Sequence, residues 1–557
     1  MEHFANLRRR LFVTSLRTGQ LPPGEQQQQA ATMGSGSFGG ASKTCGHVEE
    51  GKHMTQSGDA RQGNGDCQGG GVQYAAAFDS GTTALKGALV ARDGRIVASA
   101  SRDLTLIIDG DHREQDPREW WRAFCDVSQD LLRAAVKQEA DFAPNQIAGI
   151  ICSGQMQDVI ALGAGLEPVR NAILYSDGRA EAEAEQLGTA YPGGTARFLE
   201  AVGNRLEGCL PVPKLMWLRN HEPETFAKIR HVVISSKDYL IAQLTGECVG
   251  DVAACSTAGA MDIRTGQWDA ALCKAATIDL AILPELHKPQ DQIGTVTVAA
   301  AWSTGFAVDT PVYAGIGDAG ATTLASGVSK PGQYNINIGT SGWIATVSPE
   351  PFTDKPGAAN LAFGVEPGFV NAVPFLNAGD VHKWVTSVFT DGNYAEAHRL
   401  IEASEPGSNG VLCLPYLVGE RFPVMNPNIR GAYVGLDPDT TKADMMRAAL
   451  EGVAFSIRQG MESFDAEPTA ISLIGGGARE AAWCQILADV LEHSIEVFAN
   501  ADILPAVAMA SLVFNAPGLL QSVCERTVYQ PNPDTARTYA NAYRRFLNLY
   551  PMLRTMD

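Results

Sequence analysis

Three short turns rich in Gly, Thr and Ser carry the residue types that a phosphate chain needs. They are Asp79-Ser-Gly-Thr-Thr83, Gly339-Thr-Ser-Gly342 and Gly475-Gly-Gly-Ala478. Glycine lets backbone N–H groups approach a phosphate closely, hydroxyls add donors, and a carboxylate such as Asp79 can hold a divalent cation. A single Gly-Thr hairpin is more often only a turn. Three of them, each directly after an apolar run, predict a nucleotide held between two lobes. The chain lacks G-x-x-x-x-G-K-[ST], which excludes a P-loop enzyme.

The elements that must position these turns follow from the apolar pattern. Strands are predicted over residues 74–78, 84–90, 96–108, 147–153, 333–338, 343–347 and 471–474. Helical spacing follows at 117–137 and from about 478 to 491. Two strand–turn–strand units therefore stand about 260 residues apart. We predict two similar α/β lobes with a boundary near residue 311.

Composition restricts the class of protein. A chain of 557 residues is too long for one hydrophobic core, which predicts two or more domains. Its formal net charge of −19 disfavours duplex nucleic acid and anionic membranes as partners. No apolar run is long enough to predict a spanning helix. The 11 Cys have no paired C-x-x-C spacing, so we expect neither a disulfide framework nor a zinc site. We expect the protein to be in a reducing compartment.

The first 72 residues differ from the rest. Residues 33–71 hold 12 of the 57 Gly and few large apolar side chains, which predicts disorder. Before them, Arg8, Arg9, Arg10 and Arg17 lie among apolar residues, a pattern compatible with an organelle transit peptide or with a basic tail. The expected location is the cytoplasm, or a plastid or mitochondrion if residues 1–72 include a transit peptide.

The remainder resembles the FGGY family of carbohydrate kinases, and within it the xylulokinases. The resemblance runs from about Ala75 to Val497. Besides the three turns, it rests on Glu114-Gln-Asp-Pro117 with Trp120, Gly154-Gln-Met156, Pro211-Val-Pro-Lys214 with Trp217, Gly317-Asp318, Leu414-Pro-Tyr-Leu417, and Gly419-Glu-Arg421. It implies two ribonuclease-H-like, actin-type domains facing a central cleft, an N-terminal sugar-binding domain over 73–311 and a C-terminal nucleotide-binding domain over 312–557. It also implies phosphoryl transfer from ATP to a ketose such as D-xylulose.

The resemblance assigns roles to the residues of the turns. Asp318 would be the general base, although an Asp at this position is equally a helix cap on the residues alone. Asp79 and Asp318 would hold Mg²⁺. The expected ATP-binding residues are Gly81, Thr82, Thr83, Gly339, Thr340, Ser341, Gly476, Gly477 and Ala478.

The sugar site departs from the family pattern. Its expected residues are Gln155, Met156, Gln157, Tyr175, Asp318 and Ala319. Xylulokinases usually carry His where this chain has Gln157, and often Asn or Gln where it has Ala319. A lost hydrogen-bond partner can change the preference among polyols. Kinases for D-ribulose, sedoheptulose or another polyol therefore stay open, as do a non-catalytic nucleotide-binding sensor and a sugar-independent ATPase. The expected partners are a sugar and ATP, with a homodimer left open.

Overall fold

The computed structural model describes residues 73–355, 357–499 and 503–554, and these fall in one compact unit. The expectations for the segment 1–72 lie outside the described residues. No helix within the described ranges is long and apolar enough to cross a membrane.

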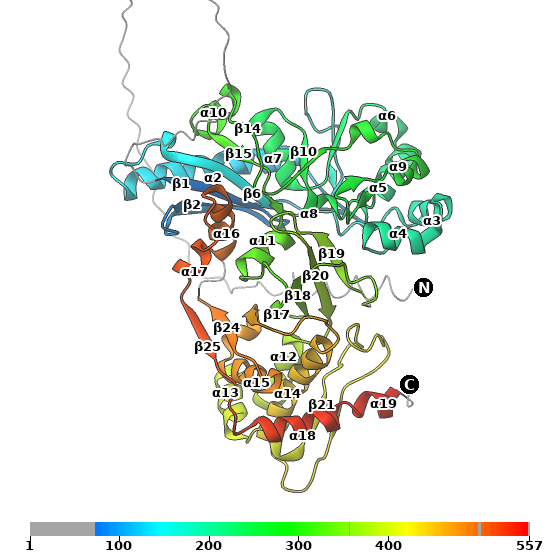
Figure 1. Ribbon diagram of the computed structural model, residues 1–557, viewed down its shortest axis with the longest axis vertical. Helices are drawn as coiled ribbons and strands as arrows, with labels where there is room; N and C mark the ends of the chain where they lie inside the picture. The colour runs from blue at the N-terminus through cyan, green and yellow to red at the C-terminus, as the bar shows by residue number, and fades with distance from the viewer. Residues whose placement is uncertain (1–72, 356, 500–502, 555–557) are drawn as a thin grey trace, which may run out of the picture. The chain divides into compact units, whose positions relative to one another are not determined.

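The first sheet is mixed and has seven strands (Figure 1). Its path is β14 (Gln292–Thr295), β15 (Pro311–Tyr313), β6 (Ile147–Gly154), β1 (Tyr74–Ser80), β2 (Ala84–Ala91) and β3 (Ile96–Asp103), with β16 (Ile316–Gly317) also paired to β6. Strand β1 is antiparallel to β2 and parallel to β6. The expected strand over 96–108 ends earlier, because the chain bends at Leu104, whose N–H donates to Thr83 O at 2.9 Å, before β4 (Ile107–Asp109).

Alternating side chains of β1 explain how helices cover both faces of this sheet. Phe78 packs with α2 (Pro117–Gln138) on one face, whereas Ala75 packs with α16 (Leu504–Val513) on the other (Figure 1). Helix α2 begins after Asp116, whose carboxylate accepts from Arg118 N–H at 3.0 Å. Helix α16 comes from the C-terminal part of the chain, so the layers of the first lobe are not contiguous in sequence.

The second sheet repeats the order of pairings of the first. Its path is β19 (Ala359–Ala362), β20 (Phe369–Phe375), β18 (Gly342–Ser348), β17 (Gln333–Ile338), β23 (Ala470–Ile474), β24 (Ile495–Phe498) and β25 (Arg526–Tyr529). Strand β17 is antiparallel to β18 and parallel to β23, as β1 is to β2 and β6. The two similar α/β lobes predicted from the sequence, each ribonuclease-H-like, are therefore confirmed.

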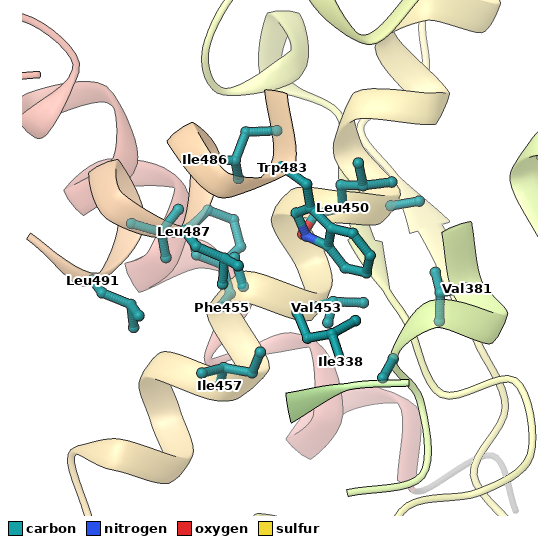
Figure 2. Packing of buried hydrophobic residues seen from close by; sticks show 14 of the residues in the cluster. Ile338, Val381, Leu450, Val453, Phe455, Ile457, Trp483, Ile486, Leu487 and Leu491 are labelled. Carbon is teal, nitrogen blue, oxygen red and sulfur yellow. The ribbon is translucent and has the colours of Figure 1, made fainter. Parts of the chain in front are cut away.

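Helices fill the core of the second lobe. They include α12 (Gly379–Thr390), α13 (Tyr394–Ala403), α14 (Lys442–Met461), α15 (Ala481–Leu491), α18 (Ala536–Phe546) and α19 (Leu549–Leu553). Figure 2 shows the Trp483 ring among Ile338, Leu450 and Val453. The Trp483 indole is fully buried and its N–H donates to Leu450 O at 3.2 Å, which satisfies its one polar group. The helix predicted from about residue 478 begins at Ala481, because the preceding Gly476–Arg479 form a 3₁₀ turn and Glu480 caps α15.

The remaining elements are short and mostly lie between β3 and β14. The helices are α3 (Glu181–Ala190), α4 (Gly194–Val202), α5 (Pro211–His221), α6 (Pro223–Phe226), α7 (Ser236–Thr245), α8 (Val252–Cys255), α9 (Ala270–Ala276), α10 (Val298–Thr304), α11 (Asp318–Ala325) and α17 (Leu519–Val523). The strands are β5 (His112–Gln115), β7 (Ile160–Leu162), β8 (Ala172–Ile173), β9 (His231–Val233), β10 (Val249–Asp251), β11 (Met261–Asp262), β12 (Gln267–Trp268), β13 (Glu285–His287), β21 (Leu412–Leu414) and β22 (Ala432–Val434).

The predicted domain boundary at residue 311 lies close to the change from the first sheet to the second. Strands β15 and β16, at and just after that position, belong to the first sheet, and the second sheet begins at β17. The exact boundary and the central cleft stay predictions.

Candidate active site

Two carboxylates lie at the same edge of the first sheet, where neighbouring parallel strands end. Asp79 in β1 stands opposite Ser153 in β6, and Gly317 in β16 stands opposite Gly154. Ser153 Oγ donates to Asp79 Oδ1 at 2.8 Å. Asp318 follows Gly317 as the first residue of α11. We call this end of β1, β6 and β16, together with residues 79–83, 155–157 and 318–319, the first edge.

The electrostatics of Asp318 suit a proton acceptor. Burial, with a further contribution from the negative charge of Asp79, raises the pKa of Asp318 to about 7, although its carboxylate accepts from Ala319 N–H at 2.8 Å. A carboxylate whose pKa is near neutral can take a proton from a hydroxyl in the transition state. Asp318 is the first residue of α11, and Gly317 is the N-cap of this helix.

The oxygen donors at this edge suit Mg²⁺. The described residues include no group of three or more His, Cys, Asp or Glu side chains that could hold a metal ion alone. Mg²⁺ is usually bound through one or two carboxylates together with water and substrate phosphates. Asp79 and Asp318, whose like charges act on each other, fit that donor set.

The first turn of α7 holds three parts of the first edge together. Ser236 Oγ donates to Ser80 O at 2.7 Å, Ser235 Oγ donates to Gln155 O at 2.7 Å, and Lys237 Nζ donates to Ala314 O at 3.0 Å. These carbonyls belong to the last residue of β1, to the residue directly after β6 and to the loop that leads into β16. One helix terminus therefore fixes the spacing of the segments that carry Asp79, Gln155 and Asp318.

The Lys237 side chain is fully buried and its charge is compensated. It pairs with Asp238 and, at 2.8 Å, with Asp251. Although burial alone would lower it, these two carboxylates hold the pKa of Lys237 above its ordinary value. The sequence interpretation missed Lys237 and Asp238. The capping box formed by Ser235 and Asp238 was the signal that could have marked this helix start.

Gln155 takes part in a buried polar network. Its side chain is 1% exposed, its Nε2 donates to Gln115 Oε1 at 2.8 Å, and its Oε1 accepts from Thr82 Oγ1 at 2.8 Å. Thr82 Oγ1 also lies 3.4 Å from the Tyr175 hydroxyl. The network joins three motifs of the sequence, and both side-chain groups of Gln155 are engaged in orienting Thr82 and Gln115.

Of the other expected sugar residues, Met156, Tyr175 and Ala319 lie near Asp318 or Gly317, whereas Gln157 contacts Cys209. Met156 packs against Gly317, where an added Cβ would overlap with the Met156 sulfur. The pKa of Tyr175 is raised by burial and by the charges of Asp318 and Asp158, which places its hydroxyl in their neighbourhood. Ala319 is exposed, next to Asp318 in the chain. Gln157 has a positive φ of 68° and its Nε2 donates to Cys209 Sγ at 3.3 Å.

The Gly339–Gly342 turn lies at the corresponding edge of the second sheet. Its Thr340 and Ser341 are exposed. Gly379 N–H donates to Gly339 O at 2.8 Å and Asp380 N–H donates to Thr340 O at 3.1 Å. A Cβ at Gly379 would overlap with Gly339 O, so the start of α12 can approach this turn only without a side chain.

The third turn lies at the same edge, because β17 and β23 end side by side. Asn337 stands opposite Ile474 in the parallel pair, and Gly475 continues with φ 92°. A Cβ at Gly477 would overlap with Ile338, so the 3₁₀ turn that includes Ala478 packs closely on the end of β17. We call residues 339–342 and 475–478 the second edge. Within the described residues, no hydrogen bond or ion pair joins residues 81–83 to this edge.

The segment Gly419-Glu-Arg421 supports the second edge. Glu420 is buried, and its Oε1 accepts from Leu376 N–H and Arg421 N–H, both at 2.7 Å. Its Oε2 accepts from Asn377 Nδ2 at 2.9 Å. Asn377 is separated from Gly379 only by Ala378, the N-cap of α12, so Glu420 holds the segment that leads into the start of α12 beside the Gly339 turn.

Comparison with known proteins decides the family. Residues 74–325 match the N-terminal domain and residues 334–510 the C-terminal domain of the FGGY family of carbohydrate kinases. The chain belongs to the FGGY family of carbohydrate kinases. It is a carbohydrate kinase, a transferase for which ATP is the expected phosphoryl donor.

Individual FGGY relatives differ in the sugar that their names give. A xylulose kinase of Escherichia coli is 31% identical over 86% of this chain and 98% of its own length. A gluconokinase of Bacillus subtilis is 28% identical over 76% of this chain and 84% of its own length. The crystal structure of xylulose kinase from Rhodospirillum rubrum superposes with a TM-score of 0.77 at 28% identity, covering 87% of this chain and 99% of that one. These matches establish the kinase class and leave the sugar to be argued.

Proposed function

We propose that this FGGY kinase transfers the γ-phosphoryl group of ATP to a ketose, most readily D-xylulose, to give D-xylulose 5-phosphate. The observation that supports this most is the pair Asp79 and Asp318 at one edge, with the pKa of Asp318 raised to about 7 by burial and by Asp79. The E. coli relative named xylulose kinase, at 31% identity, supports D-xylulose as the first sugar to test.

In the proposed reaction Asp318 accepts the proton of the attacking sugar hydroxyl. Phosphoryl transfer depends on positioning and charge neutralisation more than on covalent work by the protein, so a base that acts late in a loose transition state is sufficient. Asp79 and Asp318 would hold Mg²⁺, which supplies neutralisation of the phosphate charge. Thr82, Thr83, Thr340 and Ser341 carry the hydroxyls that would bind phosphate oxygens, together with the backbone of Gly81 and Gly339.

Adenosine is assigned to the third turn of the second edge. Gly475 and Gly476 are exposed and carry no side chain of their own, whereas the flanking Gly477 packs on Ile338. A flat base can approach such a backbone closely. Ala478, partly buried, would complete this contact.

The sugar is assigned to the first edge around Asp318. Met156 and Ala319 would provide an apolar wall, and Tyr175 and Gln157 the hydrogen bonds to sugar hydroxyls. Gln155 would act through Thr82, since both of its side-chain groups are already engaged.

A second candidate is a kinase for another ketose, polyol or sugar acid. Gln157 favours keeping it, because this amide donates to Cys209 at a position where xylulokinases usually carry His. A changed donor can alter the preference among similar sugars by a large factor.

The test is the rate of ADP release by the full chain with Mg-ATP. The panel is D-xylulose, D-ribulose, sedoheptulose, D-gluconate, glycerol and no sugar. Release that needs D-xylulose and exceeds the other arms would support the proposal. ADP release that requires another sugar of the panel would support the second candidate. Equal release without sugar would contradict both and indicate a plain ATPase.

A further inference from the structure

Two segments that carry expected sugar contacts are joined from behind by buried charged side chains. Asp158 follows Gln157, and Lys214 lies in α5; both side chains are 0% exposed. Lys214 Nζ donates to Gln157 O at 3.2 Å and to Leu174 O at 2.7 Å. Asp158 Oδ1 accepts from Tyr175 N–H at 2.8 Å. The two side chains thus bridge residues 157–158 and 174–175.

The burial of both ionisable side chains needs an explanation other than stability. Burial raises the pKa of Asp158, and the charge of Lys214 opposes this. Asp158 Oδ2 has no hydrogen-bond partner among the described residues. Replacing buried ionisable side chains by apolar ones is often neutral or stabilising, so stability alone does not account for them. Their hydrogen bonds to Tyr175 N–H and to the Gln157 and Leu174 carbonyls instead hold two backbone segments in place.

The backbone of Gln157 is held in an unusual conformation. Its φ of 68° lies in the left-handed region, which a residue other than Gly, Asn or Asp rarely adopts. Lys214 binds the carbonyl of this same residue, and the Gln157 amide is directed to Cys209. A backbone held in such a conformation by its surroundings is typical of residues that serve a site.

We propose that Asp158 and Lys214 are positioning residues of the sugar site, which fix Gln157 relative to Tyr175 and thereby set the KM for the sugar and the preference between sugars. The inference rests on the proposed function only in that Gln157 and Tyr175 face the sugar. Among the described residues, neither Asp158 nor Lys214 hydrogen-bonds to residues 81–83 or to the second edge, so the affinity for ATP should depend on them less than the affinity for the sugar.

The experiment compares full-length Lys214→Met and Asp158→Asn with wild type by KM for the sugar, KM for ATP and kcat. Loss of both Lys214 hydrogen bonds should raise the sugar KM by roughly tenfold or more, whereas ATP KM should stay within about twofold. Asp158→Asn keeps an acceptor for Tyr175 N–H and should give a smaller rise of the same kind. The ratio of kcat/KM between D-xylulose and D-ribulose should change in both variants.

The matched control is Glu451→Gln in the second lobe. Glu451 is also buried and pairs with Arg447 at 2.8 Å, away from the first edge. It should lower the melting temperature without changing the sugar KM. A Lys214 variant that does the same as this control would overturn the inference. If Lys214→Met does not fold, Asp158→Asn decides in the same way.

The two hypotheses fail differently. Wild type that phosphorylates D-gluconate rather than D-xylulose would contradict the proposed sugar, and the KM comparison is then made with D-gluconate. Active wild type with an unchanged sugar KM in both variants would contradict the positioning role alone. Wild type that uses no sugar would overturn both.

Discussion

The two sheets have the same order of strand pairings but different chemistry where their strands end. At the first edge the side chains of Asp79, Gln155 and Asp318 carry the polar groups. At the second edge glycines bring the backbone close to neighbouring strands, and Thr340 and Ser341 are exposed. A repeated frame therefore supports an acidic edge on one lobe and a backbone-lined edge on the other. We propose the first for the sugar and the phosphate that is transferred, and the second for adenosine.

The edges also differ in how they are held. The first edge depends on buried side-chain ions, since Lys237 binds Ala314 O and pairs with Asp238 and Asp251. The second edge depends on backbone contacts made possible by Gly379, with Glu420 binding the segment just before it. Substitutions at the two edges should consequently affect different kinetic constants.

The largest expected effect is that of Asp318→Asn. Loss of the general base should reduce kcat by about 10²–10⁴-fold, because positioned proton transfer contributes that much. Binding of ATP in the absence of Mg²⁺, measured by titration calorimetry, should not be weaker than that of wild type. A variant that keeps most of its kcat would show that Asp318 is not the base.

Gly379→Ala should act on the other edge. Its Cβ would overlap with Gly339 O, so the turn must move, and we expect KM for ATP to rise by roughly tenfold, the equivalent of about 1.4 kcal/mol. KM for the sugar should change little. The control is Gly518→Ala, where a Cβ meets open space. Equal rises in both KM values would argue against separate edges.

The pH dependence of folding stability tests the raised pKa of Asp318 at the first edge without substrate. Because the pKa of Asp318 is raised from 3.8 to about 7 in the folded protein, the unfolded state loses this proton first. Folding stability therefore falls as pH rises from about 4 to 7, and stays lower above that. Asp318→Asn should remove this fall, so its melting temperature, without metal or nucleotide, should exceed that of wild type more at pH 8 than at pH 4. The same difference at both pH values would contradict the raised pKa.

Glu420→Gln should give the smallest effect. Gln keeps one acceptor but replaces the other with a donor, so one contact to Leu376, Arg421 or Asn377 is lost. We expect KM for ATP to rise by about two- to fivefold, with the sugar KM unchanged. Steady-state kinetics measures KM for ATP at saturating sugar and KM for the sugar at saturating ATP. A change in the sugar KM alone would contradict the placement of Glu420 at the second edge.

The sequence predicted those features that local pattern controls. Residues 333–338 were predicted as a strand and form β17, and the Gly339 turn follows this strand as expected. The strand predicted over 74–78 forms β1, which continues through Asp79 to Ser80. Apolar alternation and Gly-rich turns are local signals, so they survive without tertiary information. The break after β3 was missed, because it depends on a bond from Leu104 to the distant Thr83.

The parts of the site that were missed depend on contacts between distant segments. The sequence placed Lys214 only within a family motif and gave no role to Lys237. The reason is that no local pattern shows that either lysine is fully buried. Gln155 was expected at the sugar, whereas its hydrogen bonds connect Thr82 and Gln115. The assigned roles of the site residues stay predictions until substrates are bound.

The most direct test of the division between edges is a crystal structure with Mg²⁺, a non-hydrolysable ATP analogue and D-xylulose. The account predicts a sugar hydroxyl within about 2.6–3.2 Å of the Asp318 carboxylate, and adenosine beside residues 475–478. Adenosine at the first edge, or a sugar bound away from Asp318, would contradict it.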